Sequence, residues 1–194
     1  MDAVRVSLLR EMLAGTEWLR ATRAFAGTLT TAVRRGPGGL LLVGTAAYEP
    51  WHLAAHLDEE AAWSGLPALS PTLVRYRVPP GAPAHLAVDL GRLAAAGRGE
   101  TLLVVAPGAP GAPLLERVDS ARRSGATVLA LGPEGDLAGL AHDALTLPPE
   151  PALSLDVVQH LVSSAAGSPP GGRRPFRDRL SRLADRLTTP PPRW

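Results

Sequence analysis

The hydrophobic positions of this chain form short apolar runs that alternate with longer segments of mixed polarity. Runs of strand length lie at 40–43, 72–78, 101–106, 127–131 and 144–147. The segments between and after them, at 50–63, 84–96, 113–124, 134–141 and 153–166, have the length and pattern of helices. This alternation predicts an α/β fold with a parallel sheet, because each crossover between parallel strands lays a helix against the sheet.

The predicted architecture is a three-layer αβα sandwich around a five-stranded parallel sheet. In sheets of this kind, ligands bind beyond the carboxyl ends of the strands, where the strand order reverses. The loops 44–50 and 106–112 follow the first and third predicted strands. We therefore expect the functional residues to lie in these two loops and at the starts of the helices that follow them.

The two ends of the chain differ from this central pattern. Residues 1–35 have helical apolar spacing up to the GPGG sequence at 36–39, and we expect this helical segment to mediate oligomerisation. The sequence GSPPGGRRP at 167–175 has the composition of a linker. Beyond it, Phe176, Leu180, Leu183 and Leu187 form one apolar stripe among arginines. The sequence thus divides into a segment 1–35, a domain 36–166 and an amphipathic C-terminal arm 167–194.

Composition removes several classes of function. All 20 basic residues are Arg, and the 194-residue chain contains neither Lys nor Cys. These absences exclude a Walker-A lysine, Schiff-base catalysis, disulfides and cysteine-ligated metals. The sequence also has no G-x-S-x-G, G-x-G-x-x-G or EF-hand motif, and we expect no cofactor. No apolar run is long enough for a transmembrane segment and no signal peptide is evident, so we expect a cytoplasmic protein.

The positive charge is concentrated in the C-terminal arm. Residues 171–194 hold seven of the 20 Arg but only two of the 18 acidic residues, although the net charge of the chain is only +2. The arm could contact nucleic acid or anionic lipid. It could instead dock on a protein partner or on its own oligomer through residues 173–194. We favour docking on a partner or on its own oligomer, because four apolar side chains give modest membrane affinity and Asp178 and Asp185 dilute the charge.

Three blocks of the sequence resemble the SIS (sugar isomerase) domain family, in particular the single-domain phosphoheptose isomerase type. They are GGLLLVGTAAYEPWHLAAHL at 38–57, GRGETLLVVAPGAPGAPLLERVDSARRSGATVLALGP at 97–133, and the segment from GDLAGLAHDALTLPPEP into the helix at 153–166. The resemblance implies a flavodoxin-like strand order 2-1-3-4-5, assembly into dimers or tetramers, and a sugar-phosphate ligand. It also places ligand contacts at Thr45, Tyr48, Gly108 and Gly111.

The loop that resembles the second phosphate loop of the family differs from it in chemistry. The family uses hydroxyl groups and backbone N–H groups there to bind phosphate at a helix N-terminus. Residues 106–113 of this chain read APGAPGAP, which contains no hydroxyl group. Pro107, Pro110 and Pro113 also lack a backbone N–H. This loop is therefore expected to bind phosphate poorly.

The resemblance also identifies candidate catalytic residues. Isomerases of this family use a Glu on the helix after the first loop and a His on the last helix to move a proton. In this chain His56 occupies the Glu position and His52 matches a family histidine, whereas Ser164 occupies the position of the catalytic His, with His160 one turn earlier. An active enzyme would need a relocated acid/base pair drawn from Glu49, His52 and His56.

Two local patterns allow more than one interpretation. His52 and His56 are four residues apart, so they share a helix face and could bind a metal, but no third ligand is evident and we expect no metal. The sequence Tyr48-Glu49-Pro50-Trp51 could form a ligand-recognition loop, in which the aromatic ring stacks on a ligand and Glu49 accepts hydrogen bonds. It could instead simply start the helix, since Pro and acidic residues favour the first turn.

These observations predict a SIS-like domain that has lost its catalysis and acts as a homo-oligomeric binding, regulatory or scaffolding module. One alternative is an active aldose/ketose phosphate isomerase. A second alternative is a module that binds nucleic acid or a protein partner through the Arg-rich arm.

Overall fold

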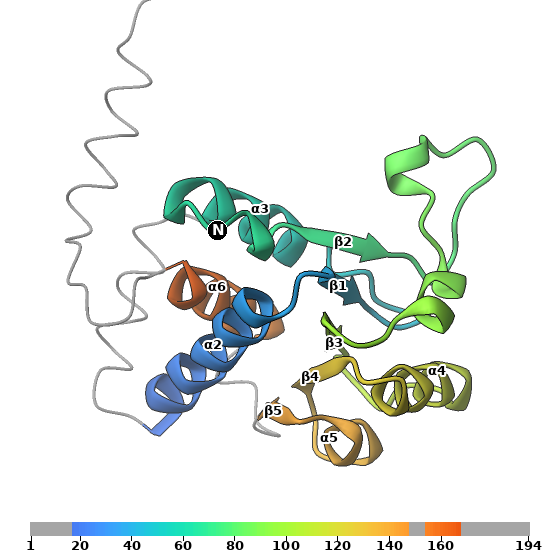
Figure 1. The fold of residues 1–194 in the computed structure, drawn as a ribbon. Helices are drawn as coiled ribbons and strands as arrows, with labels where there is room; N and C mark the ends of the chain where they lie inside the picture. The colour runs from blue at the N-terminus through green and yellow to red at the C-terminus, as the bar shows by residue number, and fades with distance from the viewer. Residues whose placement is uncertain (1–16, 148–153, 168–194) are drawn as a thin grey trace, which may run out of the picture.

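The sheet has five strands, all parallel, in the order β2-β1-β3-β4-β5 (Figure 1). The computed structural model describes residues 17–147 and 154–167. The strands are β1 (Gly39–Val43), β2 (Pro71–Val74), β3 (Glu100–Val105), β4 (Thr127–Gly132) and β5 (Asp143–Thr146). The α/β class and the strand order expected from the sequence are both confirmed.

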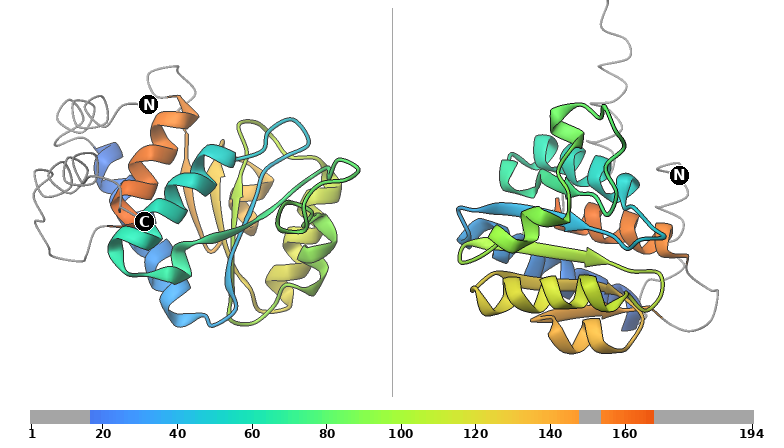
Figure 2. Two further views of the ribbon diagram at one scale, coloured as in Figure 1. Left: turned by 90° about the horizontal axis from the view of Figure 1, so that it is seen from above. Right: turned by 90° about the vertical axis from the view of Figure 1, so that its right-hand side faces the viewer.

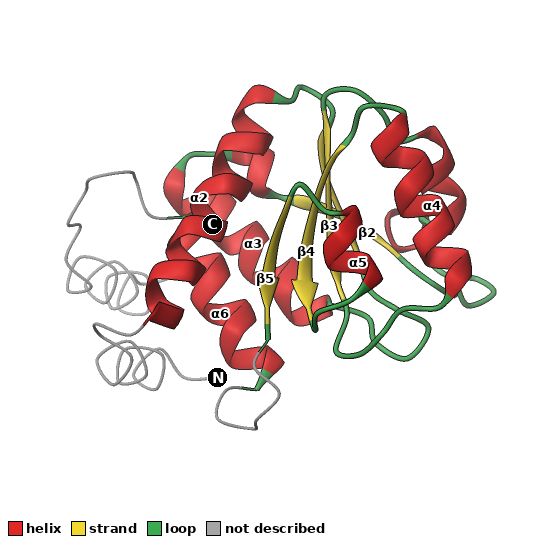
Figure 3. Ribbon diagram, turned by 90° about the horizontal axis from the view of Figure 1, so that it is seen from below, coloured by secondary structure: helices red, strands yellow, loops and turns green. Residues whose placement is uncertain are grey.

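Helices cover both faces of the sheet and complete the three layers. One face carries α2 (Glu17–Arg35), α3 (Trp51–Ser64) and α6 (Leu155–Ala166), and the other carries α4 (Ala112–Arg123) and α5 (Asp136–Leu140). Figures 2 and 3 show the sheet between these two groups of helices. Because α3 and α6 lie on the same face and pack against each other, their side chains can form a common site.

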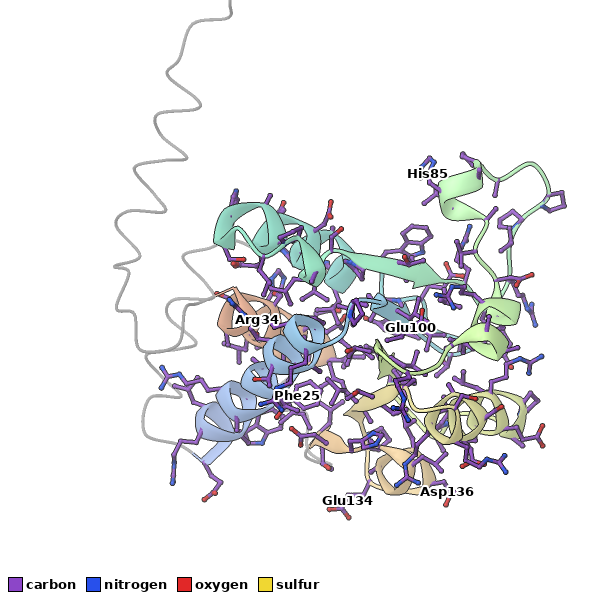
Figure 4. All side chains as sticks on the ribbon, in the orientation of Figure 1. Phe25, Arg34, His85, Glu100, Glu134 and Asp136 are labelled. Carbon is purple, nitrogen blue, oxygen red and sulfur yellow. The ribbon has the colours of Figure 1, made fainter. Side chains whose placement is uncertain are left out.

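The apolar runs are continuous because both faces of each central strand are buried. Successive side chains of a strand point to opposite faces, so Leu40 and Leu42 join the core beneath α2, α3 and α6, whereas Leu41 and Val43 join the core beneath α4 and α5. Phe25 projects from α2 into the first of these cores (Figure 4). Burial on both sides makes the sheet a rigid support for the loops at its carboxyl edge.

Two predicted elements differ from the structure. The segment 84–96 is not one α-helix but two short 3₁₀ helices, η2 (Ala84–Leu86) and η3 (Leu90–Ala95), separated where the Asp89 side chain accepts a hydrogen bond from the Gly91 N–H. The predicted strand 72–78 ends at Val74, because the Arg75 N–H bonds to the Val88 carbonyl instead of continuing in the sheet. The segment 75–89 therefore projects beyond β2 and carries His85 at its tip (Figure 4).

The ends of the chain lie mostly outside the described residues. Of the predicted N-terminal helical segment, residues 17–35 are helical as α2. The first 16 residues and the C-terminal arm, with its apolar stripe and its arginines, are outside the described part. No helix among residues 17–147 and 154–167 is both long and apolar enough to cross a membrane.

Candidate functional site

Three histidines from two helices come together on one side of the sheet. His52 and His56 lie one turn apart on α3, and His160 lies on α6, which packs against α3. The ring centroids are 4.7 Å apart for His52 and His56, 4.6 Å for His52 and His160, and 4.1 Å for His56 and His160. The structure thus supplies the third imidazole that the sequence spacing did not reveal, and we call this group the histidine cluster.

The geometry of the histidine cluster suits a transition metal. One nitrogen from each ring can be chosen so that all three lie within 4.8 Å of one another. In tetrahedral zinc sites with Zn–N bonds of about 2.0–2.1 Å, ligand nitrogens are about 3.4 Å apart, so small side-chain rotations would bring the rings to that spacing. Zinc sites with three protein ligands leave a fourth position for water or substrate. The expectation of no metal rested on a missing third ligand, and His160 now provides one.

Burial keeps the inner histidine uncharged. His160 is only 5% exposed, and its Nε2 atom has no hydrogen-bond partner among the described residues. Desolvation, followed by the nearby His56 and His52, lowers the pKa of His160 from 6.5 to about 4. Desolvation and then His52 also lower the pKa of His56, although Glu59 opposes this shift at 3.3 Å from the Nδ1 atom. A neutral imidazole is the form that binds a metal ion.

A polar pair extends the site towards the loop after β1. Gln159 is fully buried on α6, and its Nε2 donates a hydrogen bond of 2.7 Å to the hydroxyl of Tyr48. Burial raises the pKa of Tyr48 and keeps its hydroxyl protonated at neutral pH. The Oε1 atom of Gln159 is buried without a hydrogen-bond partner in the described part of the chain. Such an unpaired acceptor is costly unless a ligand or water satisfies it.

Lowering the pH from about 7 to about 4 is expected to destabilise the metal-free protein through His160. In the unfolded chain an ordinary histidine protonates near 6.5, whereas in the folded protein His160 protonates only near 4. Between these values the unfolded state binds the extra proton, so the contribution is fully present above about pH 6.5 and is lost as the pH falls towards 4. The measurement is Tm against pH in the presence of a chelator.

The variant His160→Gln cannot titrate, so its Tm should fall less over the same pH interval. His85→Gln is the matched control, because His85 is exposed at the tip of the segment 75–89. Parallel Tm profiles for the wild type and His160→Gln would contradict the assignment of this pH dependence to His160.

Glu49 is held by two neighbours and does not face the histidine cluster as a free base. Both of its carboxylate oxygens accept hydrogen bonds from Arg75, at 3.1–3.3 Å, and Oε2 also accepts one from the indole of Trp51 at 2.7 Å. Arg75 lies over the Trp51 ring, with its Cζ atom 4.9 Å from the ring centroid. The Trp51 ring and the Glu49 carboxylate, which could have recognised a ligand, therefore contact Arg75 in this structure.

The loop after β1 is a tight turn that places Tyr48. The N–H of Thr45 donates to the carbonyl of Tyr48 at 2.8 Å, and the N–H of Tyr48 donates to the carbonyl of Thr45 at 3.2 Å. Helix α3 then begins at Trp51, with Pro50 as its N-cap residue and no side-chain cap. Thr45 and Tyr48 thus lie at the carboxyl edge of the sheet, as expected, and the hydroxyl of Tyr48 is bonded to Gln159, the residue before His160 on α6.

The loop after β3 offers little to a ligand. Gly108 and Gly111 are both exposed, and Gly111 is the N-cap of α4 without a side-chain cap. The loop carries no hydroxyl group, and its three prolines lack N–H donors. The two glycines leave open space around them, since a Cβ atom would meet nothing within 4 Å at Gly108 and only Pro113 at Gly111. Their proposed role as ligand contacts remains a prediction.

Sequence reasoning missed two functional candidates, Gln159 and Arg75. Gln159 precedes His160 on the last helix. Arg75 lies inside the predicted strand 72–78, whereas in the structure it directly follows β2. Because the predicted strand extended to residue 78, the sequence did not place Arg75 at the carboxyl edge of the sheet, near the loop 44–50. Gln159 could not be oriented without the packing of α6 on α3.

Comparison of the sequence with known proteins gives no match, either to a family model or to a curated protein. Comparison of the structure gives several. The sugar isomerase domain of an RpiR transcription factor from Sphaerobacter thermophilus is 18% identical, with 84% of this chain and 87% of that chain covered and a TM-score of 0.52. The Vibrio vulnificus NanR protein in complex with ManNAc-6P is 15% identical, with coverage of 96% and 73% and a TM-score of 0.53.

A Methanococcus jannaschii protein inferred to be a 3-hexulose-6-phosphate isomerase is also similar, at 9% identity, with coverage of 92% and 86% and a TM-score of 0.50. The first of these structures is thus a sugar isomerase domain, and the third is inferred to be a phosphosugar isomerase. The likeness therefore confirms the fold that the sequence blocks indicated. At these identities, the fold is what the comparison shows.

Proposed function

We propose that this protein is a catalytically degenerate SIS-like module that binds a sugar-derived ligand and acts as a homo-oligomer in a regulatory or scaffolding role. The support for ligand binding is the fold, which it shares with a transcription factor domain and with a protein in complex with ManNAc-6P. The homo-oligomer follows from the resemblance and from the apolar pattern of residues 1–35. Its test is the mass of the full chain by light scattering.

The observation that carries the proposal is the histidine cluster itself. A proton transfer between sugar carbons needs a base and an acid that face the substrate from opposite sides. Here the imidazoles of His52, His56 and His160 contact one another, and the Glu49 carboxylate is engaged by Arg75 and Trp51. Such an arrangement suits metal binding better than acid/base catalysis. We therefore include in the proposal a divalent transition metal, such as Zn²⁺, held by the three imidazoles.

The histidine cluster, Tyr48 and Gln159 each have a role in this proposal. The three imidazoles hold the ion, which supplies a positively charged position for an oxygen of the ligand when it is bound. The hydroxyl of Tyr48 donates a hydrogen bond to a ligand, since Gln159 already donates to its oxygen. The free carbonyl oxygen of Gln159 accepts one from a water or ligand hydroxyl. Tyr48 and Gln159 thus offer one donor and one acceptor to a ligand.

The purified protein is expected to bind sugar phosphates without converting them. The reason is that neither position of the family's acid/base pair retains its residue, with His56 and Ser164 in place of the Glu and His. The measurement is exchange of the C2 proton of aldose phosphates and of the C1 protons of ketose phosphates in D₂O by NMR, alongside a thermal-shift screen of phosphorylated and unphosphorylated sugars.

Ligand at about a hundred times its Kd should add about 2.7 kcal/mol to the free energy of unfolding. A Tm shift with no exchange above the protein-free rate supports the proposal. Exchange or isomerisation that His56→Ala abolishes would establish the alternative, an active phosphosugar isomerase.

A further inference from the structure

A pocket lies between the loop after β1 and the segment that follows β2. It has a volume of about 340 Å³ and is formed by residues 46–49 and by residues 75–77 and 79. Tyr48, Glu49 and Arg75 line it together with Tyr76 and Arg77. Of these residues, the sequence pointed to Tyr48 and Glu49 as site candidates but to neither arginine, so the chemistry of this pocket comes from the structure.

 Arg75, Tyr76 and Arg77 directly follow the end of β2.

Arg75 is fixed in this pocket by its neighbours. Its Nε and Nη2 atoms donate hydrogen bonds to the Glu49 carboxylate. Its Cζ atom lies over the Trp51 ring, 4.9 Å from the ring centroid. The side chain of Arg75 is only 15% exposed. Its Nη1 group has no hydrogen-bond acceptor among the described residues, so two N–H donors remain for a ligand. A guanidinium that is already oriented loses little side-chain entropy when an anion binds.

Arg77 adds a second guanidinium with no fixed partner. It is exposed and makes no ion pair within the described part of the chain. The pocket thus presents the positive charges of Arg75 and Arg77 against the single negative charge of Glu49. The net charge of +1 favours an anion, and guanidinium groups bind phosphate and carboxylate oxygens through paired hydrogen bonds.

The loop after β3 is a poor site for a phosphate, so the anionic group of a ligand needs another position. Residues 106–113 have lost the hydroxyl groups and, at three prolines, the N–H groups that would bind a phosphate. The pocket lies on the opposite side of β1, because β2 and β3 are the two neighbours of β1 in the sheet. Tyr48 lines this pocket and also bonds to Gln159 on α6. A single small ligand can therefore have its anionic group here and its remaining hydroxyl groups towards Tyr48.

We propose that Arg75 and Arg77 form the anion subsite of this protein, which takes the phosphate or carboxylate group of a small hydroxylated ligand. The inference rests on the proposed function, because it assigns a position to the anionic group of the sugar-derived ligand. Arg77 binds the anion directly. Arg75 binds it through Nη1, while Glu49 and Trp51 position its guanidinium group.

The test is calorimetric titration of the full chain with inorganic phosphate, glucose 6-phosphate, gluconate and glucose. Glucose 6-phosphate or gluconate should bind more tightly than glucose, and the comparison between them identifies phosphate or carboxylate as the preferred group. The variant Arg77→Gln should weaken the binding of the preferred anion by about tenfold or more, since it removes a charge-assisted hydrogen bond. Arg122→Gln is the matched control, with the same change of charge at an exposed position of α4.

Arginine side-chain NMR gives a second, direct readout. The Nε–Hε signal that is absent from Arg77→Gln identifies Arg77, and this signal should shift when the anion is added to the wild type. Equal affinity for Arg77→Gln and the wild type would overturn the anion subsite and leave the proposed function standing. A sugar phosphate that fails to bind at all would instead contradict the proposed function.

Discussion

Addition of Zn²⁺ to the metal-free protein is expected to raise its Tm by about 5–10 °C, and the variant His160→Ala is expected to lose this effect. Zinc at about a hundred times its Kd adds about 2.7 kcal/mol of stability, and each kcal/mol shifts the Tm of a chain of this size by about 2–4 °C. The three imidazole nitrogens within 4.8 Å of one another are the basis of this expectation. Without His160 only two ligands remain, and zinc affinity should fall by about 100-fold or more.

Because His160 is buried, its replacement by alanine also leaves a cavity that lowers stability by itself. His52→Ala separates the two effects, since His52 is exposed and its loss should weaken zinc binding with little change in the Tm of the metal-free protein. His85→Ala controls for surface binding, because His85 is exposed and outside the histidine cluster. Calorimetry that gives the same zinc affinity for the wild type and both cluster variants would rule out the metal site.

The strands could be predicted from the sequence because both faces of the sheet are buried. Leu102 and Leu103 point to opposite cores, yet both must be apolar, so the strand appears as an uninterrupted apolar run. The segment 84–96 was predicted wrongly as one helix. Its apolar spacing fits a helix, but the Asp89 side chain bonds to the Gly91 N–H and starts a separate 3₁₀ turn. Local competition of this kind leaves little trace in hydrophobic periodicity.

The histidine cluster could be predicted only in part. The spacing of His52 and His56 places them on one helix face, and this followed from the sequence alone. His160 is more than a hundred residues away in the chain, and its position depends on the packing of α6 against α3. The contact between Glu49 and Arg75 likewise joins two strand ends that only the strand order brings together. Sequence periodicity describes faces of single elements, whereas this site is made where elements meet.

The variant Gly44→Ala is expected to lower the free energy of unfolding by about 2–4 kcal/mol, a fall in Tm of roughly 5–15 °C. Gly44 directly follows β1 and is buried, and a Cβ atom there would lie 1.9 Å from the backbone oxygen of Tyr48 and 2.7 Å from the Cδ atom of Pro50. The backbone oxygen cannot move away without loss of its hydrogen bond with the Thr45 N–H. The measurement is thermal and urea denaturation.

Gly27→Ala is the matched control, since a Cβ atom at Gly27 meets nothing within 4 Å and alanine favours the helix α2 by about 1 kcal/mol. The two glycine variants should thus change the stability in opposite directions. Displacement of the Thr45–Tyr48 turn also moves the Tyr48 hydroxyl away from Gln159, so Gly44→Ala should weaken ligand binding at a temperature where the variant is still folded. A Gly44→Ala protein as stable as the wild type would show that the turn can relax, and that the site does not depend on the close approach of the chain at the end of β1.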